Sequence, residues 1–343
     1  MLTEEKLPER DGEVWGKSAI LQLERDILQF IYPTIRSVIK KIELKKLETL
    51  EEIRLRADKP LMIHSGGSEW FVSQGGQLLT NRTGSFVVCQ QEVIKSLELM
   101  CENSVYAYQE EIRNAFLTLR GGHRVGISGR AVLDGASMKF IKDVSSLNIR
   151  MSRQVKGCAA KIIKYLISEN REIYNTLIIS PPQCGKTTLL RDISRLLGDG
   201  IDSLHFKGVK VGIIDERSEI AACYKGVPQN DIGCRSDVLD GCPKQVGMSM
   251  LLRSMSPEVI ITDEIGNQGD YDAVMKVINA GVKLITSAHG YNISEMKSRE
   301  EVIRLIEKKV FERYVVLDNA KGPGNVKEII DGQRMEVIYS DAS

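Results

Sequence analysis

The sequence has almost no net charge: its 343 residues contain 47 Lys and Arg against 46 Asp and Glu, which sum to +1 at neutral pH. This balance gives no general attraction to nucleic acid or to an anionic membrane, although it leaves room for a local basic patch. The hydrophobic fraction of 42% and the charged fraction of 27% are typical of globular proteins. At this length we expect two domains.

The sequence also lacks long apolar runs. No stretch approaches the roughly 18 apolar residues that cross a membrane. The first residues, Met1–Lys6, are charged, unlike the apolar centre of a signal peptide. We therefore expect no transmembrane segment and a cytoplasmic location.

Paired cysteines are absent as well. The seven cysteines form no Cys-x-x-Cys pair and have no histidine at ligand spacing. This argues against a zinc site and favours reduced thiols in a reducing compartment. Cys184 differs from the others because it lies near Lys186 in a loop that resembles a phosphate-binding loop. A small structural residue is the favoured interpretation of Cys184, ahead of a regulatory thiol.

The most informative segment is Leu177–Asp192, which predicts a buried strand, a tight loop and the beginning of a helix. It contains Gly185-Lys186-Thr187-Thr188, the second half of a P-loop. Backbone N–H groups at such a helix N-terminus bind phosphate oxygens, and the helix dipole favours their charge. Lys186 is expected at the β- and γ-phosphates of ATP, and the Thr187 hydroxyl at Mg²⁺. The other predicted nucleotide contacts are Pro181, Pro182, Gln183, Cys184, Gly185 and Thr188.

One loop position departs from the pattern, because Ser180 stands where the motif normally begins with glycine. Glycine is used where φ is positive or where the backbone approaches a ligand closely. Two explanations are open. Ser180 avoids that geometry with the help of the rigid Pro181-Pro182, or the chain enters the loop differently.

The domain organisation follows from the patterns on either side of this loop. Residues 1–50 are predicted to be a partly disordered helical segment, and residues 51–156 a smaller α+β domain. A linker helix is predicted over 157–172. Residues 173–343 alternate apolar strands with helices, which indicates a mostly parallel, doubly wound α/β sheet. We therefore predict a RecA-like P-loop NTPase core in this part.

The individual elements are predicted from hydrophobic periodicity and turn residues. A first helix from about Ala19 to Glu43 is kinked or split by Pro33. Hairpins are expected around Gly66-Gly67 and Gly121-Gly122. The strands of the second domain are predicted at 176–180, 209–215, 259–263 and 283–287, with helices beginning near Thr187, Pro243, Tyr271 and Ile293.

The strand Val259–Asp263 runs into two carboxylates, Asp263 and Glu264, which is a Walker B pattern. Asp263 is expected to hold Mg²⁺, and Glu264 to orient and polarise the attacking water. Two acidic residues at a strand end also occur as helix caps, but a P-loop in the same sheet makes the catalytic interpretation stronger.

Two further strand ends carry polar residues. Asp215-Glu216 is a second pair of carboxylates at a strand end. Asp215 is expected at the metal, and Glu216 at the γ-phosphate or the metal-bound water. An ion pair between Glu216 and an arginine is the alternative. His289 is expected to sense the γ-phosphate, against the alternative of a structural histidine.

Arginines complete the predicted site, because phosphoryl transfer gains from an arginine supplied in cis or in trans. Arg253 lies just before the Walker B strand, and Arg124, Arg130 and Arg150 lie on strands or strand ends of the first half. An ordinary surface salt bridge is the simpler interpretation for any one of them.

Several long motifs resemble a known family: Glu51–Arg56, Gly121–Gly126, Asp215–Ile220, Pro228–Gly233, Asp240–Lys244 and Arg253–Gly266. Together they resemble the stage III sporulation protein AA family, a branch similar to the ATPases of type II and type IV secretion systems and of type IV pili. The resemblance extends from about Glu51 to His289.

The resemblance implies a cytoplasmic ATPase at the mother-cell side of a channel between mother cell and forespore. It also implies a homo-hexameric ring with nucleotide between the two domains, and a membrane-anchored partner, stage III sporulation protein AB, with other channel components. Asp215-Glu216 matches the aspartate box of secretion ATPases, and His289 matches their histidine box. By position, Arg124, Arg130 and Arg150 match arginines that approach the phosphates.

Three functions are compatible with the sequence. A motor ATPase is favoured. A nucleotide-dependent nucleic-acid binding protein on the same core is the alternative, which the near-neutral charge disfavours, so that no nucleic acid is expected. A scaffold that binds nucleotide but barely hydrolyses it is the third.

Overall fold

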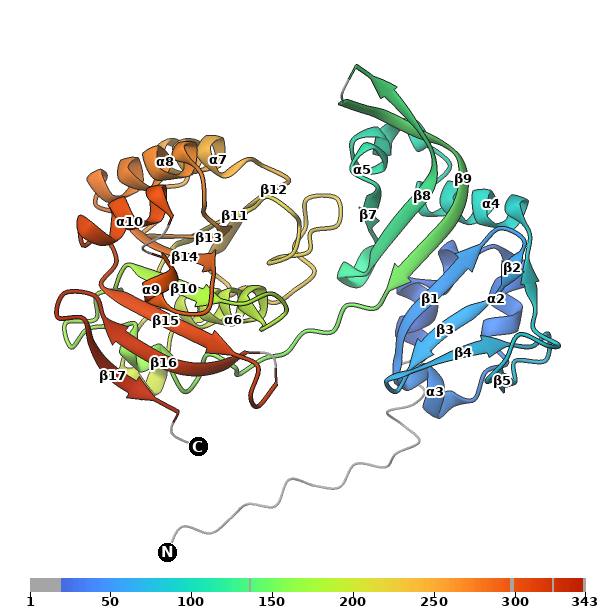
Figure 1. Ribbon diagram of the computed structural model, residues 1–343, viewed down its shortest axis with the longest axis horizontal. Helices are drawn as coiled ribbons and strands as arrows, with labels where there is room; N and C mark the ends of the chain where they lie inside the picture. Colours follow the sequence, from blue (N-terminus) through green and yellow to red (C-terminus); the bar gives the residue numbers. More distant parts are fainter. Residues whose placement is uncertain (1–19, 136, 297–298, 323, 342–343) are drawn as a thin grey trace, which may run out of the picture. The chain divides into compact units, whose positions relative to one another are not determined.

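The computed structural model describes residues 20–135, 137–296, 299–322 and 324–341. The chain divides into two compact units, Met1–Arg153 and Gln154–Ser343 (Figure 1). The disorder predicted for the first residues concerns residues 1–19, which lie outside the described part. None of the helices in the described ranges is both long and apolar enough to span a membrane.

The first unit contains mainly antiparallel strands. They are β1 (Leu50–Arg56), β2 (Lys59–Pro60), β3 (Met62–Ser65), β4 (Ser68–Val72), β5 (Leu78–Leu79), β6 (Val87–Val88), β7 (Phe116–Thr118), β8 (Arg124–Asp134) and β9 (Ser137–Arg150). Its helices are η1 (Leu28–Phe30), α2 (Pro33–Ile39), α3 (Leu44–Glu48), α4 (Gln90–Met100), η2 (Val105–Tyr108), α5 (Gln109–Arg113) and η3 (Arg120–Gly122), where η marks a 3-10 helix.

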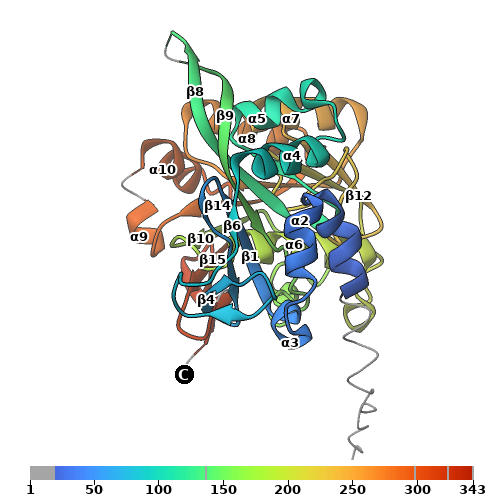
Figure 2. The same cartoon turned by 90° about the vertical axis from the view of Figure 1, so that its right-hand side faces the viewer.

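Seven of these strands form one antiparallel sheet in the order β5-β4-β3-β1-β9-β8-β7. Ile53 on β1 pairs with Ile149 on β9 and with Ile63 on β3, so the three side chains share a face of the sheet. They are buried in one core with Ile35 of α2 and Val93 of α4. The helices therefore cover this face, and Figure 2 shows α2, α3 and α4 beside the strands.

The predicted first helix is split, as Pro33 indicated. Residues 20–26 are helical, and α2 begins at Pro33, where the missing N–H costs nothing. Ile27, Ile35 and Leu50 lie in the core of the first unit. The described part of the segment 1–50 is thus an integral part of this unit.

The second unit contains the alternation of strands and helices. Its strands are β10 (Thr176–Ser180), β11 (Val211–Asp215), β12 (Ser236–Asp240), β13 (Val259–Glu264), β14 (Lys283–His289), β15 (Arg313–Asp318), β16 (Asn325–Asp331) and β17 (Glu336–Ser340). Its helices are η4 (Ile163–Tyr165), α6 (Lys186–Asp199), η5 (Asp202–Leu204), α7 (Lys244–Ser254), α8 (Gln268–Asn279), α9 (Ile293–Met296) and α10 (Glu300–Glu307).

These strands form one sheet in the order β12-β11-β13-β14-β10-β15-β16-β17. The first six are parallel, and β16 and β17 add antiparallel pairs at one side. Ile178 packs in one core with Ile193 of α6, whereas its neighbour Ile179 packs in another with Met248 of α7 and Val274 of α8. Helices therefore cover both faces, which confirms the predicted doubly wound α/β fold.

The segment predicted as a linker helix has another structure. Residues 157–172 contain turns and only the short η4. Its backbone is held by tertiary hydrogen bonds, from Ala159 N to Asp192 Oδ2 at 2.8 Å and from Arg313 Nε to Tyr165 O at 3.0 Å. The apolar periodicity of this segment reflects packing on the core of the second unit.

Replacing Gly332 with alanine is expected to destabilise the second unit. A Cβ at Gly332 would lie 2.1 Å from the backbone oxygen of Phe311, and neither backbone can move freely because Gly332 N donates to Glu312 O. We expect Gly332→Ala to lower the free energy of unfolding by ~2 kcal/mol or more, measured by urea denaturation.

Gly266→Ala is the matched control, because a Cβ at Gly266 meets no atom within 4 Å. Equal unfolding midpoints for the two variants would contradict the packing described at Gly332.

Candidate functional site

The carboxyl ends of four neighbouring parallel strands meet at one edge of the second sheet. In sheet order these strands are β11, β13, β14 and β10, and they end at Asp215, Glu264, His289 and Ser180. A cavity of about 490 Å³ opens at this edge. Its lining residues are Pro182, Gln183, Gly185, Lys186, Thr187, Thr188, Leu190, Arg217, Glu219, Lys244, Asp263, Glu264 and Ser287.

The loop after β10 has its positive-φ residues beyond Ser180. Ser180 is fully buried and is not among the residues with positive φ. Positive φ occurs instead at Gln183 (61°) and Gly185 (84°). Ser180 thus avoids the geometry that requires glycine, which is the first of the two explanations. Helix α6 begins at Lys186, so its free N–H groups lie at the loop.

Cys184 faces the protein core rather than the cavity. It is 5% exposed, and its Sγ lies 3.5 Å from the carbonyl oxygen of Pro182. Its own carbonyl accepts a hydrogen bond from Gly324 N at 2.8 Å. These contacts are those of a small structural residue. Neither Cys184 nor Pro181 lines the cavity, although both were predicted as nucleotide contacts.

Lys186 and Glu264 form an ion pair across the cavity. The Nζ of Lys186 lies 3.2 Å from Glu264 Oε2, with the lysine side chain 17% exposed and the glutamate side chain 48% exposed. Lys186 and Glu264 therefore neutralise each other here.

Asp263 lies deeper than Glu264, with a side chain that is 19% exposed. Burial raises the pKa of Asp263 to about 6; the charge of Lys244 lowers it in part, whereas those of Asp215 and Glu216 raise it further. Its Oδ1 atom is buried and has no hydrogen-bond partner. An ionised oxygen in this position is suited to a cation.

Asp215 is completely buried and does not line the cavity. Its Oδ1 accepts a hydrogen bond from Glu219 N and its Oδ2 one from Ala221 N, each at 2.8 Å. Burial raises the pKa of Asp215 although these N–H groups oppose the shift. The carboxylate therefore organises the turn after β11, and we do not retain Asp215 as a metal ligand.

Glu216 pairs with a lysine rather than with an arginine. The Nζ of Lys244 donates to Glu216 Oε2 at 2.5 Å and lies 3.6 Å from Asp263 Oδ1. Lys244 is the first residue of α7 and is 8% exposed. Burial works against its charge, but the hydrogen bond to Glu216 and the charges of Asp263 and Asp270 raise the pKa of Lys244 overall.

Sequence reasoning assigned no role to Lys244, although it ends the motif Asp240–Lys244. It also missed four other lining residues, Leu190, Arg217, Glu219 and Ser287. The available signal was position, because each lies within a few residues of the carboxyl end of a parallel strand or at the start of the following helix.

His289 and Arg253 lie outside the cavity lining. The Nδ1 of half-buried His289 is 3.2 Å from the carbonyl oxygen of Ser180. Arg253 is exposed in the last turn of α7, and the chain then enters β13 at Val259. Because α7 leads back to the amino end of β13, Arg253 belongs to the sheet edge opposite the cavity. The predicted catalytic role of Arg253 within its own site is therefore withdrawn.

The three arginines predicted to approach the phosphates lie in the first unit. Arg124 stacks over the ring of Phe116, with its Cζ 3.8 Å from the ring centroid. Arg130 Nη1 lies 3.9 Å from Asp143 Oδ2, and Arg150 is exposed at the end of β9. Their approach to a nucleotide stays a prediction.

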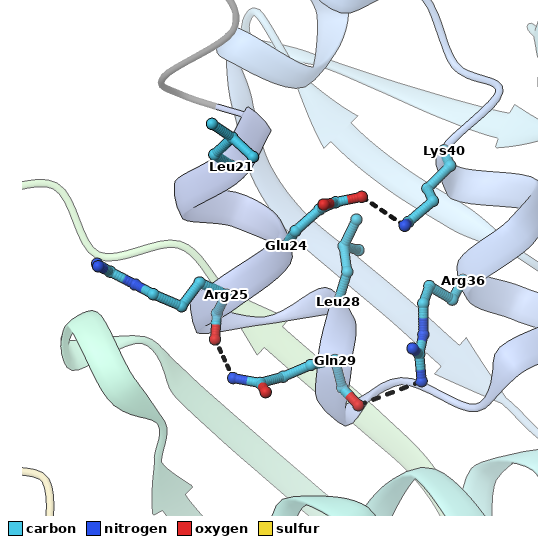
Figure 3. A pocket seen from close by; sticks show the side chains of 7 residues that line it. All are labelled: Leu21, Glu24, Arg25, Leu28, Gln29, Arg36 and Lys40. Atoms are coloured by element: carbon cyan, nitrogen blue, oxygen red, sulfur yellow. Dashed lines mark hydrogen bonds and ion pairs between the residues drawn. The ribbon is translucent and has the colours of Figure 1, made fainter.

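The first unit has a cavity of its own, of about 310 Å³, which Figure 3 shows. Its lining residues are Leu21, Glu24, Arg25, Leu28, Gln29, Arg36 and Lys40. Lys40 pairs with Glu24, Arg25 pairs with Asp26, and Arg36 donates to the carbonyl oxygen of Gln29 at 3.2 Å. Its cations are thus engaged, and this cavity offers no catalytic group comparable to the first.

Solved structures share this fold, among them an ATPase and a pilus retraction motor. The ATPase DotB of Legionella pneumophila is similar with a TM-score of 0.52 at 14% identity, covering 95% of this chain and 83% of that chain. The pilus retraction motor PilT, solved with bound ADP, has a TM-score of 0.50 at 13% identity, with 85% and 77% covered. The second unit thus has a RecA-like α/β fold, and the first is a smaller α+β domain.

The sequence comparisons reach further. Stage III sporulation protein AA of Bacillus subtilis (strain 168) is 40% identical over 306 residues, which cover 89% of this chain and 94% of that protein. Protein SEEDLING PLASTID DEVELOPMENT 1 of Arabidopsis thaliana is 36% identical over 155 residues, or 45% of this chain and 21% of that protein. Because residues 22–337 also match the family described as sporulation stage III, protein AA, the chain belongs to that family.

Proposed function

We propose that the chain is a Mg²⁺-dependent ATPase that works as a motor. The observation that carries the proposal is the convergence of Lys186, Asp263 and Glu264 on one cavity at the N-terminus of α6. A positive residue, a metal-binding carboxylate and a second carboxylate are the groups that phosphoryl transfer to water requires.

The protein supplies the phosphate site from its own backbone. The free N–H groups at the start of α6 and the turn at Gln183–Gly185 form a cradle for phosphate oxygens. Lys186 is placed to bind the terminal phosphates. To do so it leaves Glu264, with which it pairs in this structure.

The residues present fit a magnesium ion. Asp263 Oδ1 is a buried oxygen without a hydrogen-bond partner, and Thr187 lines the same cavity at the second position of α6. These two residues would hold the ion, whose charge would neutralise phosphate oxygens when bound. Both oxygens of Asp215 are already engaged by backbone N–H groups.

Glu264 is the better candidate for orienting the attacking water. It lines the cavity and is released when Lys186 turns to phosphate, whereas Glu216 lies outside the lining and is held by Lys244. A carboxylate that loses its lysine partner becomes a stronger hydrogen-bond acceptor for water. His289, hydrogen-bonded to the loop backbone at Ser180, links the end of β14 to the phosphate loop.

Family membership and the likeness to DotB and PilT support a proposal for the wider role. We propose that the chain forms a homo-hexameric ring in the mother-cell cytoplasm. The ring would act with membrane-anchored stage III sporulation protein AB on the mother cell–forespore channel. Arg124, Arg130 and Arg150 would supply positive charge to the nucleotide from the first unit.

Removing the central groups is expected to separate binding from turnover. Lys186→Ala should weaken ATP binding about tenfold or more, because a charge-assisted hydrogen bond contributes about 1.5–3 kcal/mol. Glu264→Gln should leave binding nearly unchanged and lower kcat about 100-fold or more. Both effects are measured by titration with a fluorescent ATP analogue and by phosphate release.

Lys207→Ala and Glu307→Gln remove the same charges from exposed positions outside the cavity lining, and both should behave as the parent chain. Phosphate release that is unaltered by both Lys186→Ala and Glu264→Gln would contradict the proposed mechanism.

Asp215→Asn is expected to reduce stability without altering metal binding. An amide places an NH₂ group against one of the two backbone donors, which leaves a buried N–H unpaired at a cost of about 1–3 kcal/mol. The free energy of unfolding should fall, while Mn²⁺ affinity in the presence of ADP should match that of the parent chain. Asp263→Asn should weaken Mn²⁺ binding and leave the free energy of unfolding nearly unchanged. A loss of Mn²⁺ binding in Asp215→Asn would show that Asp215 is a metal ligand after all.

If the chain forms a ring, the mass of its assembly should depend on ligand or on protein concentration. Native mass measurement with and without ATP and Mg²⁺ should show a hexamer in at least one condition. A monomer under both conditions would argue against the ring while leaving the nucleotide site intact.

A further inference from the structure

Lys244 is the buried cation of the cavity that the proposed mechanism does not use. It lies between two strand ends, 2.5 Å from Glu216 Oε2 beyond β11 and 3.6 Å from Asp263 Oδ1 on β13. The charge of Asp270, on α8, acts on it as well. Two carboxylates, one just beyond β11 and one on β13, therefore lie within ion-pair distance of one lysine, whose side chain is 11% exposed.

We infer that Lys244 is an internal cation that competes with the divalent metal ion for Asp263 and keeps Glu216 turned away from the cavity until metal enters. This inference rests on the proposed function and concerns the regulation of the same site. Lys244 is a positioning residue, because it acts through Asp263 and Glu216.

The two distances around Lys244 distinguish this role from an ordinary ion pair. Lys244 makes a short hydrogen bond to Glu216 but stays beyond hydrogen-bond distance of Asp263. Asp263 Oδ1 is buried and has no hydrogen-bond partner at all. A purely structural lysine would be expected to satisfy that oxygen. The lysine charge instead neutralises Asp263 from a distance and leaves its oxygen available for coordination.

A cation that binds Asp263 must therefore overcome repulsion from Lys244. Two unit charges about 4 Å apart interact by several kcal/mol at the effective dielectric of a protein surface. Water and side-chain movement reduce this energy, but the remaining repulsion is expected to weaken metal binding more than tenfold. When the ion binds, Lys244 is pushed away from Asp263. Its hydrogen bond then no longer holds Glu216 in its present position.

The local sequence fixes Lys244 in this place. Pro243 precedes it as the N-cap of α7, so Lys244 is the first helical residue and its backbone is held by the helix. The next residue, Gln245, donates to Asp270 Oδ1 at 2.6 Å, which fastens the beginning of α7 to α8. The ammonium group is thus presented to the carboxylates from a rigid base.

The test measures metal affinity directly, by Mn²⁺ titration followed by electron paramagnetic resonance, with and without ADP. Lys244→Met should bind Mn²⁺ about tenfold more tightly or better than the parent chain. Lys244→Arg keeps the charge and should stay close to the parent. In turnover assays, Lys244→Met should lower the Mg²⁺ concentration for half-maximal rate and leave the KM for ATP unchanged.

Lys283→Met is the matched control, because Lys283 pairs with Glu312 at 3.2 Å in the same unit but does not line this cavity. It should leave Mn²⁺ affinity unaltered. If Lys244→Met fails to fold, Lys244→Gln keeps a polar end and should show the same gain in Mn²⁺ affinity.

Unchanged Mn²⁺ affinity in a folded Lys244→Met or Lys244→Gln variant, with ADP bound normally, would overturn the inference and leave the proposed ATPase standing. A parent chain that binds no nucleotide but gains Mn²⁺ affinity on losing Lys244 would support the inference and refute the ATPase. The two failures are therefore distinguishable.

Discussion

The burial of a parallel sheet on both faces is the constraint on which the rest of the second unit depends. Every residue of β10 and β11 is buried, because helices pack on both sides. Charged groups are costly inside such a sheet, so they are accommodated where the strands end. The loop after β10, the carboxylates Asp263 and Glu264 and the acidic turn after β11 are therefore gathered at one edge by the same packing that stabilises the core.

Because several carboxylates lie at one edge of the sheet, their negative charges must be neutralised. Two lysines do this from opposite sides of the cavity, Lys186 for Glu264 and Lys244 for Glu216 and Asp263. In the proposed function, ligand binding is an exchange of partners, because each arriving phosphate or metal ion would replace an interaction that already exists. Affinity is then set by the difference between two sets of contacts and not by the new contacts alone.

The strength and the limits of the sequence signals have physical causes. Periodicity and strand-end motifs identified the α/β core, Lys186 and Asp263-Glu264, because those features depend on local order along the chain. The role of Asp215 was not visible, since its partners are N–H groups presented by the shape of the following turn. Arg253 was misplaced because closeness in sequence to a strand says nothing about which end of that strand is near. Lys244 escaped notice because a single lysine at a helix start forms no pattern.

Helix α7 runs from the cavity to the opposite edge of the second sheet. It begins with Lys244 among the carboxylates and carries Arg253 in its last turn, near the amino end of β13. Its 11 residues correspond to roughly 16 Å of rigid rod. The same helix therefore has one end at the cavity and the other at the opposite edge of the sheet, so that any displacement of its first turn would extend to Arg253.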